Sequence, residues 1–365
     1  MRRCNQCILP ETVTGLSFDK DGACNFCKNY KKIQYKGEER LLQIFDQAKK
    51  LKRPYDAIVP LSGGRDSSYV LYYARQHGLR ILAVNFDNEF VTDLAVTNMQ
   101  QVCRAVGAEL QRFRSSSGLA RKIVRETIRN ALRYGLPTLA TSFCGACSYG
   151  FRAVVYETAR QYKTPLILWG DSKIEETRHM TAQGLKKERP FFRILTDRMR
   201  PRNIRTRLNE YRLRREFPSG RTLIEDLRLK PPQLTERSIQ EVSIYNYIGW
   251  DRHIIKKTIF NELGWRPQQG AVTTWRTDCK LEPLVTFCFK NIFGCDKSAF
   301  GYHNMINEGL MTREEALEKE EALSGQFTPQ LEDLLKKEIG LPDRDIDRIR
   351  SFAGSLAPGR AMGSR

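Results

Sequence analysis

Short apolar runs alternate with longer stretches of helical periodicity through the first half of the chain. The runs predict β-strands, and the stretches in which apolar residues recur every three or four positions predict α-helices. The predicted strands are residues 55–61, 80–87, 109–113 and 165–169, and the predicted helices are residues 38–52, 69–78, 94–106, 119–134 and 150–162. Alternation of this kind is typical of an α/β domain built on a doubly wound parallel sheet.

A glycine-rich turn joins the first predicted strand to its helix. The turn reads Ser62-Gly63-Gly64-Arg65-Asp66-Ser67-Ser68. Two adjacent glycines let backbone amides approach an anion closely, the helix N-terminus adds partial positive charge, and the serines add hydroxyl donors. The turn is not a Walker P-loop, which ends in Gly-Lys-Ser/Thr. We interpret it as a phosphate-binding loop; a serine- and glycine-rich turn with no ligand is the alternative.

Two further positions fall at the ends of predicted strands. Asp87 ends the second strand, and Gly170 and Asp171 follow the fourth. In doubly wound sheets a ligand lies at the carboxyl ends of the strands, near the point where the strand order reverses. We therefore expect Asp87 and Gly170 to lie near the phosphate-binding loop.

The composition is that of a globular protein, with 41% hydrophobic and 28% charged residues, and excludes a disordered or collagen-like chain. No run of about 18 apolar residues is present to cross a bilayer, and the N-terminal sequence lacks the apolar core of a signal peptide. We expect a cytoplasmic protein.

The charge of +19, from 61 basic and 42 acidic residues, favours an anionic partner. Residues 186–230 hold 15 basic and 6 acidic residues, a net charge of +9. A solvated helical face is one interpretation of that segment. A polyanionic substrate, a nucleic acid or an acidic protein are the others.

A reducing compartment disfavours structural disulfides, so the grouping of the ten cysteines points to metal binding or catalysis. Cys4 and Cys7 form one Cys-x-x-Cys pair and Cys24 and Cys27 another, with 16 residues between the pairs. That spacing predicts a four-cysteine zinc ribbon, in which Zn2+ has a structural role. Cys103, on an apolar helix face, is expected in the core.

The turn at residues 62–68 closely resembles the Ser-Gly-Gly-x-Asp-Ser loop of the PP-loop ATPases, the adenine nucleotide alpha hydrolase-like superfamily. The resemblance implies a Rossmann-like domain that binds ATP and Mg2+ and adenylates an oxygen of its substrate. It implies catalytic roles for Asp66 and Ser67, and ATP contacts from Ser62, Gly63, Gly64, Asp66, Ser67, Ser68, Asp87 and Gly170. Residues 170–175 are similar to a Gly-Asp/Glu-Asn-x-x-Glu turn of relatives, but Ser172 replaces the asparagine.

A second cysteine pair, Cys144 and Cys147, resembles the pair that binds a 4Fe-4S cluster in sulfur-transferring PP-loop enzymes, together with one later cysteine. Cys279 is the preferred third ligand because it stands in a polar turn; Cys288 and Cys295 are the other candidates. Three protein thiolates leave one iron open to a substrate atom. A second zinc site and a packed pair of thiols are the alternatives.

The ensemble of motifs is similar to the N-acetyl sugar amidotransferases of lipopolysaccharide O-antigen synthesis. The resemblance covers the ribbon from Cys4, both later cysteine motifs and residues 309–317. It implies an enzyme that uses ATP and ammonia to convert the acetamido group of a nucleotide-linked N-acetyl sugar into an acetamidino group. The sequence shows no glutaminase motif, so the resemblance implies a separate glutamine amidotransferase, similar to the paired histidine-biosynthesis synthase subunits, as the ammonia donor.

The second hypothesis is a tRNA thiolating PP-loop enzyme, which would use the same loop, a ribbon and a 4Fe-4S cluster. The basic segment has few interleaved aromatics for base stacking and no recognisable RNA-binding module, which disfavours nucleic acid without excluding it. A zinc-ribbon adaptor with a decayed ATPase is disfavoured because the loop residues are intact.

These observations divide the chain into four parts: a zinc ribbon at 1–36, an ATP-binding domain at 37–180, a helical substrate or partner region at 181–353 and a tail at 354–365. In the helical region, residues 198–215 and 251–263 are predicted helices, and Thr312 with Glu315 forms a predicted capping box. Tyr245, Tyr247 and Trp250 form an aromatic cluster, expected to be core rather than a platform for a sugar.

Overall fold

The computed structural model describes residues 1–114, 118–134, 145–175, 239–269 and 278–351. Its strands are β1 (Ala57–Pro60), β2 (Ile81–Asp87), β3 (Glu109–Arg114), β4 (Leu166–Trp169) and β5 (Gln240–Ser243). Its helices in the first half are α1 (Asn25–Lys28), α2 (Glu38–Lys50), α3 (Arg65–Gln76), α4 (Asp93–Val106), α5 (Leu119–Tyr134), α7 (Gly145–Gln161) and the short η1 (Lys173–Glu175). Those that follow are η2 (Ile244–Asn246), α12 (Arg252–Asn261), α13 (Glu282–Phe293), α14 (Ser298–Glu308), α15 (Arg313–Glu321), α16 (Pro329–Asp333), η3 (Leu334–Ile339) and α17 (Asp343–Ser351).

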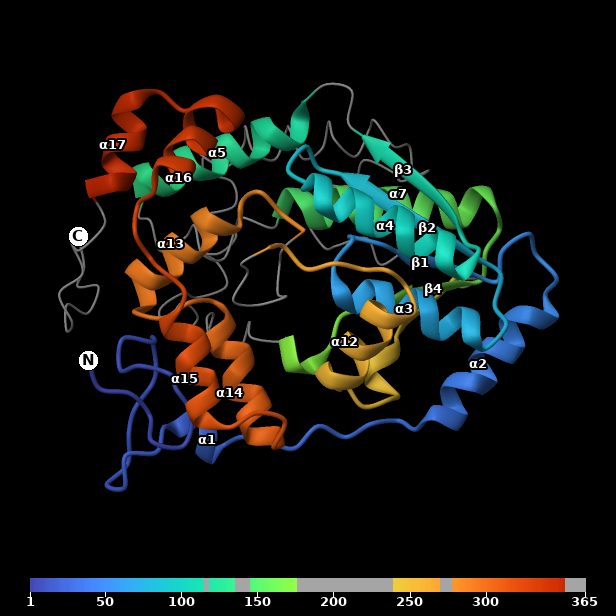
Figure 1. The fold of residues 1–365 in the computed structure, drawn as a ribbon, viewed down its shortest axis with the longest axis horizontal. Helices are drawn as coiled ribbons and strands as arrows, with labels where there is room; N and C mark the ends of the chain where they lie inside the picture. The colour runs from blue at the N-terminus through green and yellow to red at the C-terminus, as the bar shows by residue number, and fades with distance from the viewer. Residues whose placement is uncertain (115–117, 135–144, 176–238, 270–277, 352–365) are drawn as a thin grey trace, which may run out of the picture.

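The strands form one five-stranded sheet in the order β3-β2-β1-β4-β5 (Figure 1). Every pairing is parallel, and the register sets Ala57 of β1 opposite Ile81 of β2 and Leu166 of β4. The predicted α/β class with a parallel sheet is therefore confirmed, and four of its strands were expected from the apolar runs. The fifth strand, β5, was not predicted, because only Val242 among its residues is buried apolar surface.

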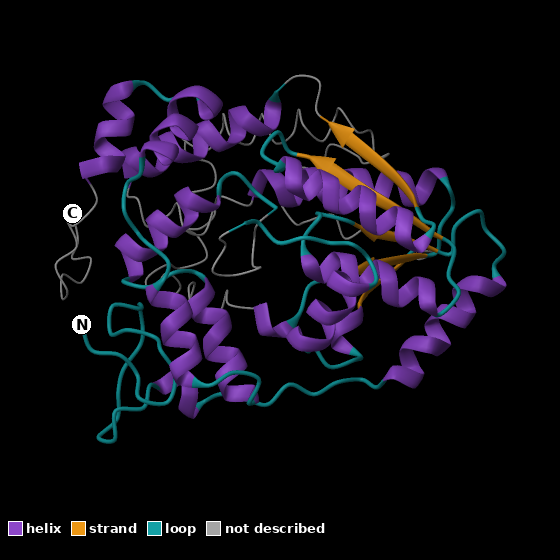
Figure 2. Cartoon of the chain, viewed as in Figure 1, coloured by secondary structure: helices purple, strands orange, loops and turns teal. Residues whose placement is uncertain are grey.

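Alternate residues of each strand face opposite layers of helices, as the period of two in a strand requires. Val59 and Ala83 face α3 and α4, whereas Ile58 and Val84 face α5 and α7. Figure 2 shows the sheet between these helices, and α12 packs on the outer side of α3. The helix α7 comes so close to β2 that a Cβ at Gly150 would lie 2.1 Å from the ring of Phe86.

The helices after β5 form a region that packs on both the sheet domain and the N-terminal segment. Helices α17 and η3 contact α5, and α14 contacts η1 at the end of β4. The N-terminal segment lies against α14 and α15 rather than apart from them (Figure 1). Within the described ranges, no helix is both long and apolar enough to cross a bilayer. The basic segment 186–230, the predicted helix 198–215 and the tail 354–365 lie outside the described residues.

Two helices begin earlier than the apolar pattern indicates. Helix α3 begins at Arg65, so the second half of the glycine-rich turn forms its first turn. Helix α7 begins at Gly145 and not near residue 150, so Cys147 lies inside the helix instead of in the loop before it. In both places small or polar residues occupy the first turn, where apolar periodicity carries no signal.

Candidate functional site

The glycine-rich loop lies where the strand order of the sheet reverses. Strand β1 is flanked by β2 on one side and β4 on the other, and the loop leaves its carboxyl end. Gly170, which follows β4, lies against the same loop: a Cβ there would be 3.2 Å from the backbone nitrogen of Ser67. Ligands of doubly wound sheets bind at this reversal point, so the loop lies where such a sheet binds a ligand.

Serine side chains hold the loop in shape. The Ser62 hydroxyl accepts a hydrogen bond from the Gly64 amide at 3.2 Å and lies 3.3 Å from the Ser67 hydroxyl. The hydroxyls of Ser67 and Ser68 donate to the Gly64 carbonyl at 3.2 and 2.8 Å. Ser68 is fully buried, so its side chain stabilises the loop from the interior of the protein.

Gly63 has a conformation and a contact that only glycine permits. Its φ is +85°, in the left-handed region, and a Cβ would lie 2.4 Å from the carbonyl oxygen of Ala95 in α4. The indole N–H of Trp265 donates to the Gly63 carbonyl at 2.8 Å. The loop is therefore fixed from two sides by elements distant in the sequence.

Asp66 is held by a cage of side chains, two aromatic ones from the chain after β5 and Arg65 beside it in α3. The Trp250 indole N–H donates to Asp66 Oδ1 at 3.0 Å, and the Arg65 guanidinium binds the same oxygen at 3.2 Å. The Tyr245 hydroxyl donates to the Asp66 carbonyl at 3.4 Å. The aromatic cluster is thus core, as expected, and it also positions the carboxylate at the start of α3.

Arg65 is a buried cation in this cage. Its guanidinium stacks over the Trp250 ring at 5.0 Å and lies 3.8 Å from Glu175 in η1. Burial acts to lower its pKa, but the carboxylates of Asp66 and Glu175 outweigh that effect and raise the pKa above its usual value. The site therefore keeps a permanent positive charge beside the loop.

The polar turn at residues 278–280 joins the same edge of the sheet. It pairs with the segment after β2, where the Thr92 amide donates to the Asp278 carbonyl at 3.2 Å and the Lys280 amide donates to the Phe90 carbonyl at 2.8 Å. A Cβ at Gly64 would lie 3.5 Å from Asp278 Oδ2. A second carboxylate thus faces the loop, and Cys279, which is partly exposed, lies next to it in the chain.

Asp87 lies at the end of β2 in a local ion pair. Its carboxylate binds Arg112 of β3 at 3.2 Å and accepts the Glu89 amide at 2.9 Å. Its side chain is 17% exposed. These contacts hold Asp87 at the ends of β2 and β3. It therefore lies beside β1 and not among the side chains that contact Asp66.

The remaining cysteines differ in burial and in whether the structure describes them. Cys144 lies outside the described residues and Cys147 lies in the first turn of α7, so the structure does not test their convergence with Cys279. Cys103 and Cys288 are buried, and burial raises the pKa of each thiol to about 12. Burial likewise raises the pKa of Cys295. Cys279 is therefore better suited than Cys288 or Cys295 to supply a thiolate.

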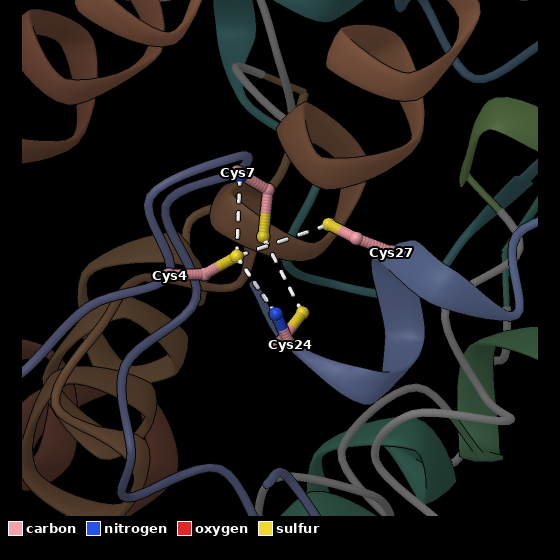
Figure 3. A group of neighbouring side chains, drawn as sticks. All are labelled: Cys4, Cys7, Cys24 and Cys27. Atoms are coloured by element: carbon pink, nitrogen blue, oxygen red, sulfur yellow. Dashed lines mark hydrogen bonds between the residues drawn. The ribbon is translucent and has the colours of Figure 1, made fainter. Parts of the chain in front are cut away.

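The four N-terminal cysteines form a compact buried cluster that could hold a metal ion (Figure 3). Their sulfur atoms all lie within 4.8 Å of one another, with 3.9 Å between those of Cys4 and Cys27 and 3.9 Å between those of Cys7 and Cys24. Tetrahedral coordination with metal–sulfur bonds of about 2.3 Å places sulfurs about 3.8 Å apart. Mutual hydrogen bonds among the four thiols lower the pKa of Cys4 and Cys24 and raise the pKa of Cys7 and Cys27.

Residues of the C-terminal helices surround this cluster. His303 Nδ1 and the Asn307 side-chain amide, both on α14, lie 3.6 Å from the Cys27 sulfur. Arg313 of α15 donates from Nε to the carbonyls of Cys4 and Cys7 at 3.2 and 2.9 Å. Sequence spacing could not identify these residues, because they lie about 300 positions from the cysteines they contact.

Of the predicted site residues, those of the loop lie with Gly170 and Cys279 at one edge of the sheet, with Asp87 beside it, and the four N-terminal cysteines form the cluster. Cys144 lies outside the described residues, and Cys147 lies in α7. No model of a known protein family matches the chain, and no curated protein matches it significantly.

Proposed function

We propose that this chain is an ATP-dependent, AMP-forming amidotransferase of the PP-loop superfamily that acts on a nucleotide-linked N-acetyl sugar. The observation that carries the proposal is the arrangement at the strand-order reversal: residues 62–68 and Gly170 adjoin there, with the carboxylates of Asp66 and Asp278 at the loop. This is the arrangement that a sheet enzyme needs to hold the phosphates of ATP.

The chemistry activates an oxygen that would otherwise leave poorly. The amide oxygen of the acetamido group attacks the α-phosphorus of ATP, and pyrophosphate departs with the broken α–β bond. Ammonia then adds to the imidate carbon and loses a proton, and the C–O bond breaks as AMP leaves. The product is an acetamidino group, and one ATP yields one AMP and one pyrophosphate.

The chain's own residues would serve this reaction as follows. Backbone amides at the start of α3 and the buried cation of Arg65 would attract the departing pyrophosphate. Asp66 and Asp278 would hold Mg2+, which neutralises phosphate charge when bound. The fit is supported by Asp278, whose carboxylate has no hydrogen-bond partner among the described residues although it faces the loop.

The cysteine cluster is proposed as a structural zinc site. Four thiolates complete a tetrahedral shell, so no coordination position remains open for catalysis. Its sulfur spacing fits zinc, and its burial keeps solvent away from the ion.

Cys144, Cys147 and Cys279 are proposed as ligands of an oxygen-sensitive 4Fe-4S cluster. The support is that Cys279 lies beside Asp278 at the loop and is partly exposed. Protein purified without oxygen should be brown and contain about four irons per chain, and Cys279→Ser should lose them. Colourless anaerobic protein with full activity would demote all three cysteines to structural roles.

The function is tested by AMP release with an ammonium salt and a panel of nucleotide-linked diacetamido sugars. Formation of AMP together with an amidino sugar is the expected result. The same assay with tRNA and a sulfur donor tests the thiolating alternative, and AMP release only with tRNA would overturn the sugar assignment. Activity with glutamine should require a separate glutaminase subunit.

A further inference from the structure

We propose that a cavity between the N-terminal segment, α14 and η1 binds a nucleoside diphosphate, separately from the ATP loop. The cavity has a volume of about 620 Å³ and is lined by residues 25, 26 and 29–34 together with Lys173 and Asn304. That volume is within the range of ligand pockets, roughly 300–1,000 Å³. Its identification with the nucleotide of a sugar substrate rests on the proposed function; the binding itself does not.

The described lining of the cavity is basic and carries no acidic side chain. Lys31, Lys32 and Lys173 all line it. Lys32 donates to the Asn307 carbonyl, whereas Lys31 and Lys173 are exposed and have no ion pair or hydrogen bond within the described part of the chain. Two ammonium groups at one opening attract two adjacent phosphates.

A buried acceptor in the cavity wall lacks a partner. Asn304 is 2% exposed, and its side-chain amide donates to the Ile174 carbonyl at 2.8 Å. That bond fixes the side chain, and its Oδ1 atom is buried with no hydrogen-bond partner in the described structure. An unpaired buried acceptor costs free energy, and a nucleobase N–H that reaches Oδ1 through a small shift of the Asn304 side chain would recover that cost.

Aromatic rings complete the wall. Phe26 and Tyr30 line the cavity and both contact His303 edge-on, with ring centroids 6.4 and 5.8 Å apart. The lysines would contact phosphates, whereas the acceptor and the aromatic rings would contact a nucleoside. A free phosphate would use only the lysines, so the lining fits a nucleoside diphosphate better.

The cavity and the loop site share η1. Lys173 of η1 lines the cavity, and Glu175 of the same turn lies 3.8 Å from the Arg65 guanidinium beside Asp66. Two residues of such a turn rise by about 4 Å. A sugar joined to a diphosphate in the cavity can therefore extend toward the loop.

Titration calorimetry with UDP as the probe tests this inference. The wild-type chain and Lys20→Ala, which removes an exposed lysine elsewhere in the N-terminal segment, should bind UDP equally. Lys31→Ala combined with Lys173→Ala should weaken UDP by about tenfold and leave ATP binding unchanged. Asn304→Ala should also weaken UDP, with thermal unfolding checked in parallel.

Asp66→Ala separates this site from the ATP loop. UDP binding retained in that variant supports the cavity, and binding lost there would assign UDP to the loop and overturn the inference. No UDP binding by the wild type, or equal affinity in the double lysine variant, would overturn it as well. Pyrophosphate binding as tight as UDP would overturn the nucleoside part. None of these outcomes bears on AMP release, which tests the proposed function by itself.

Discussion

At the scale of single residues, the Asp66 carboxylate is held in one orientation by its neighbours. Trp250 and Arg65 bind the same oxygen, at 3.0 and 3.2 Å, and only 15% of the Asp66 side chain is exposed. A carboxylate held in one orientation is preorganised, so little entropy would be lost when it binds a Mg2+ ion that carries phosphate.

Asp66→Ala and Ser67→Ala should each reduce AMP formation by at least about 100-fold, because each removes a group positioned at the proposed pyrophosphate site. The fold should persist, since neither side chain packs in the apolar core. Asp46→Ala, on the exposed face of α2, is the matched control. Turnover retained in either loop variant at saturating ATP would contradict the assignment of the loop.

Trp250→Phe should keep an aromatic ring at this position, with some loss of packing because the ring is smaller, and remove the hydrogen bond to Asp66. Loss of a hydrogen bond to a charged group corresponds to about a tenfold fall in AMP formation. Because Asp66 is proposed to hold Mg2+, the variant should also need a higher magnesium concentration for half-maximal rate. A purely structural role for Trp250 would lower the unfolding temperature and leave the magnesium dependence unchanged.

At the scale of elements, close packing of α7 on β2 sets the second layer of the sheet. Gly150 allows that approach, because any side chain there would meet the Phe86 ring. Helix propensity alone would favour alanine over glycine by about 1 kcal/mol. Helix propensity favours alanine at position 150, but close packing against Phe86 leaves room only for glycine.

Gly150→Ala should lower the free energy of unfolding by about 1–3 kcal/mol through overpacking against Phe86. Denaturant unfolding measures the change. Gly249→Ala is the control, because a Cβ there meets nothing within 4 Å. Equal stability of the two variants would show that α7 or the Phe86 ring shifts at little cost.

The start of α15 shows how tertiary contacts modify a local signal. Thr312 caps the helix as predicted, accepting the Glu315 amide at 3.1 Å. The Glu315 side chain does not complete the box but binds Arg252 of α12 at 2.6 Å. The capping sequence thus determined where α15 begins, and a distant arginine determined where its glutamate points.

At the scale of the whole molecule, the cysteine cluster joins the two ends of the chain. Arg313 contacts the carbonyls of Cys4 and Cys7, and His303 lies against Cys27. An ion pair between the partly exposed Arg3 and the fully buried Glu320, at 2.9 Å, adds to the same interface. The expected ribbon is therefore part of a larger unit that includes α14 and α15.

Purified protein should contain one zinc bound by Cys4, Cys7, Cys24 and Cys27, and its removal should destabilise α14 and α15 together with the N-terminal segment. Metal binding contributes directly to folding when four thiolates would otherwise be buried without a cation. Elemental analysis, and hydrogen exchange of residues 298–321 before and after chelation, check both statements. Soluble, active protein without zinc would contradict the structural role.

The sequence by itself determined the local features of this protein. Apolar runs and helical periodicity predicted the first four strands and the α/β class, and the spacing of two cysteine pairs predicted a cluster that the structure brings together. These features depend on neighbours in the chain, whose periodicity and spacing the backbone geometry fixes.

Only the tertiary structure decided which distant residues complete each site. Strand β5 carries little apolar signal, yet it leads into Tyr245 and Trp250 at Asp66, and the pairing of residues 278–280 with the end of β2 brings Asp278 to the loop. Such contacts arise from burying whole faces of helices and sheet against one another. Sequence position does not encode them, because the residues that meet are separated by about 180 to 200 positions of intervening chain.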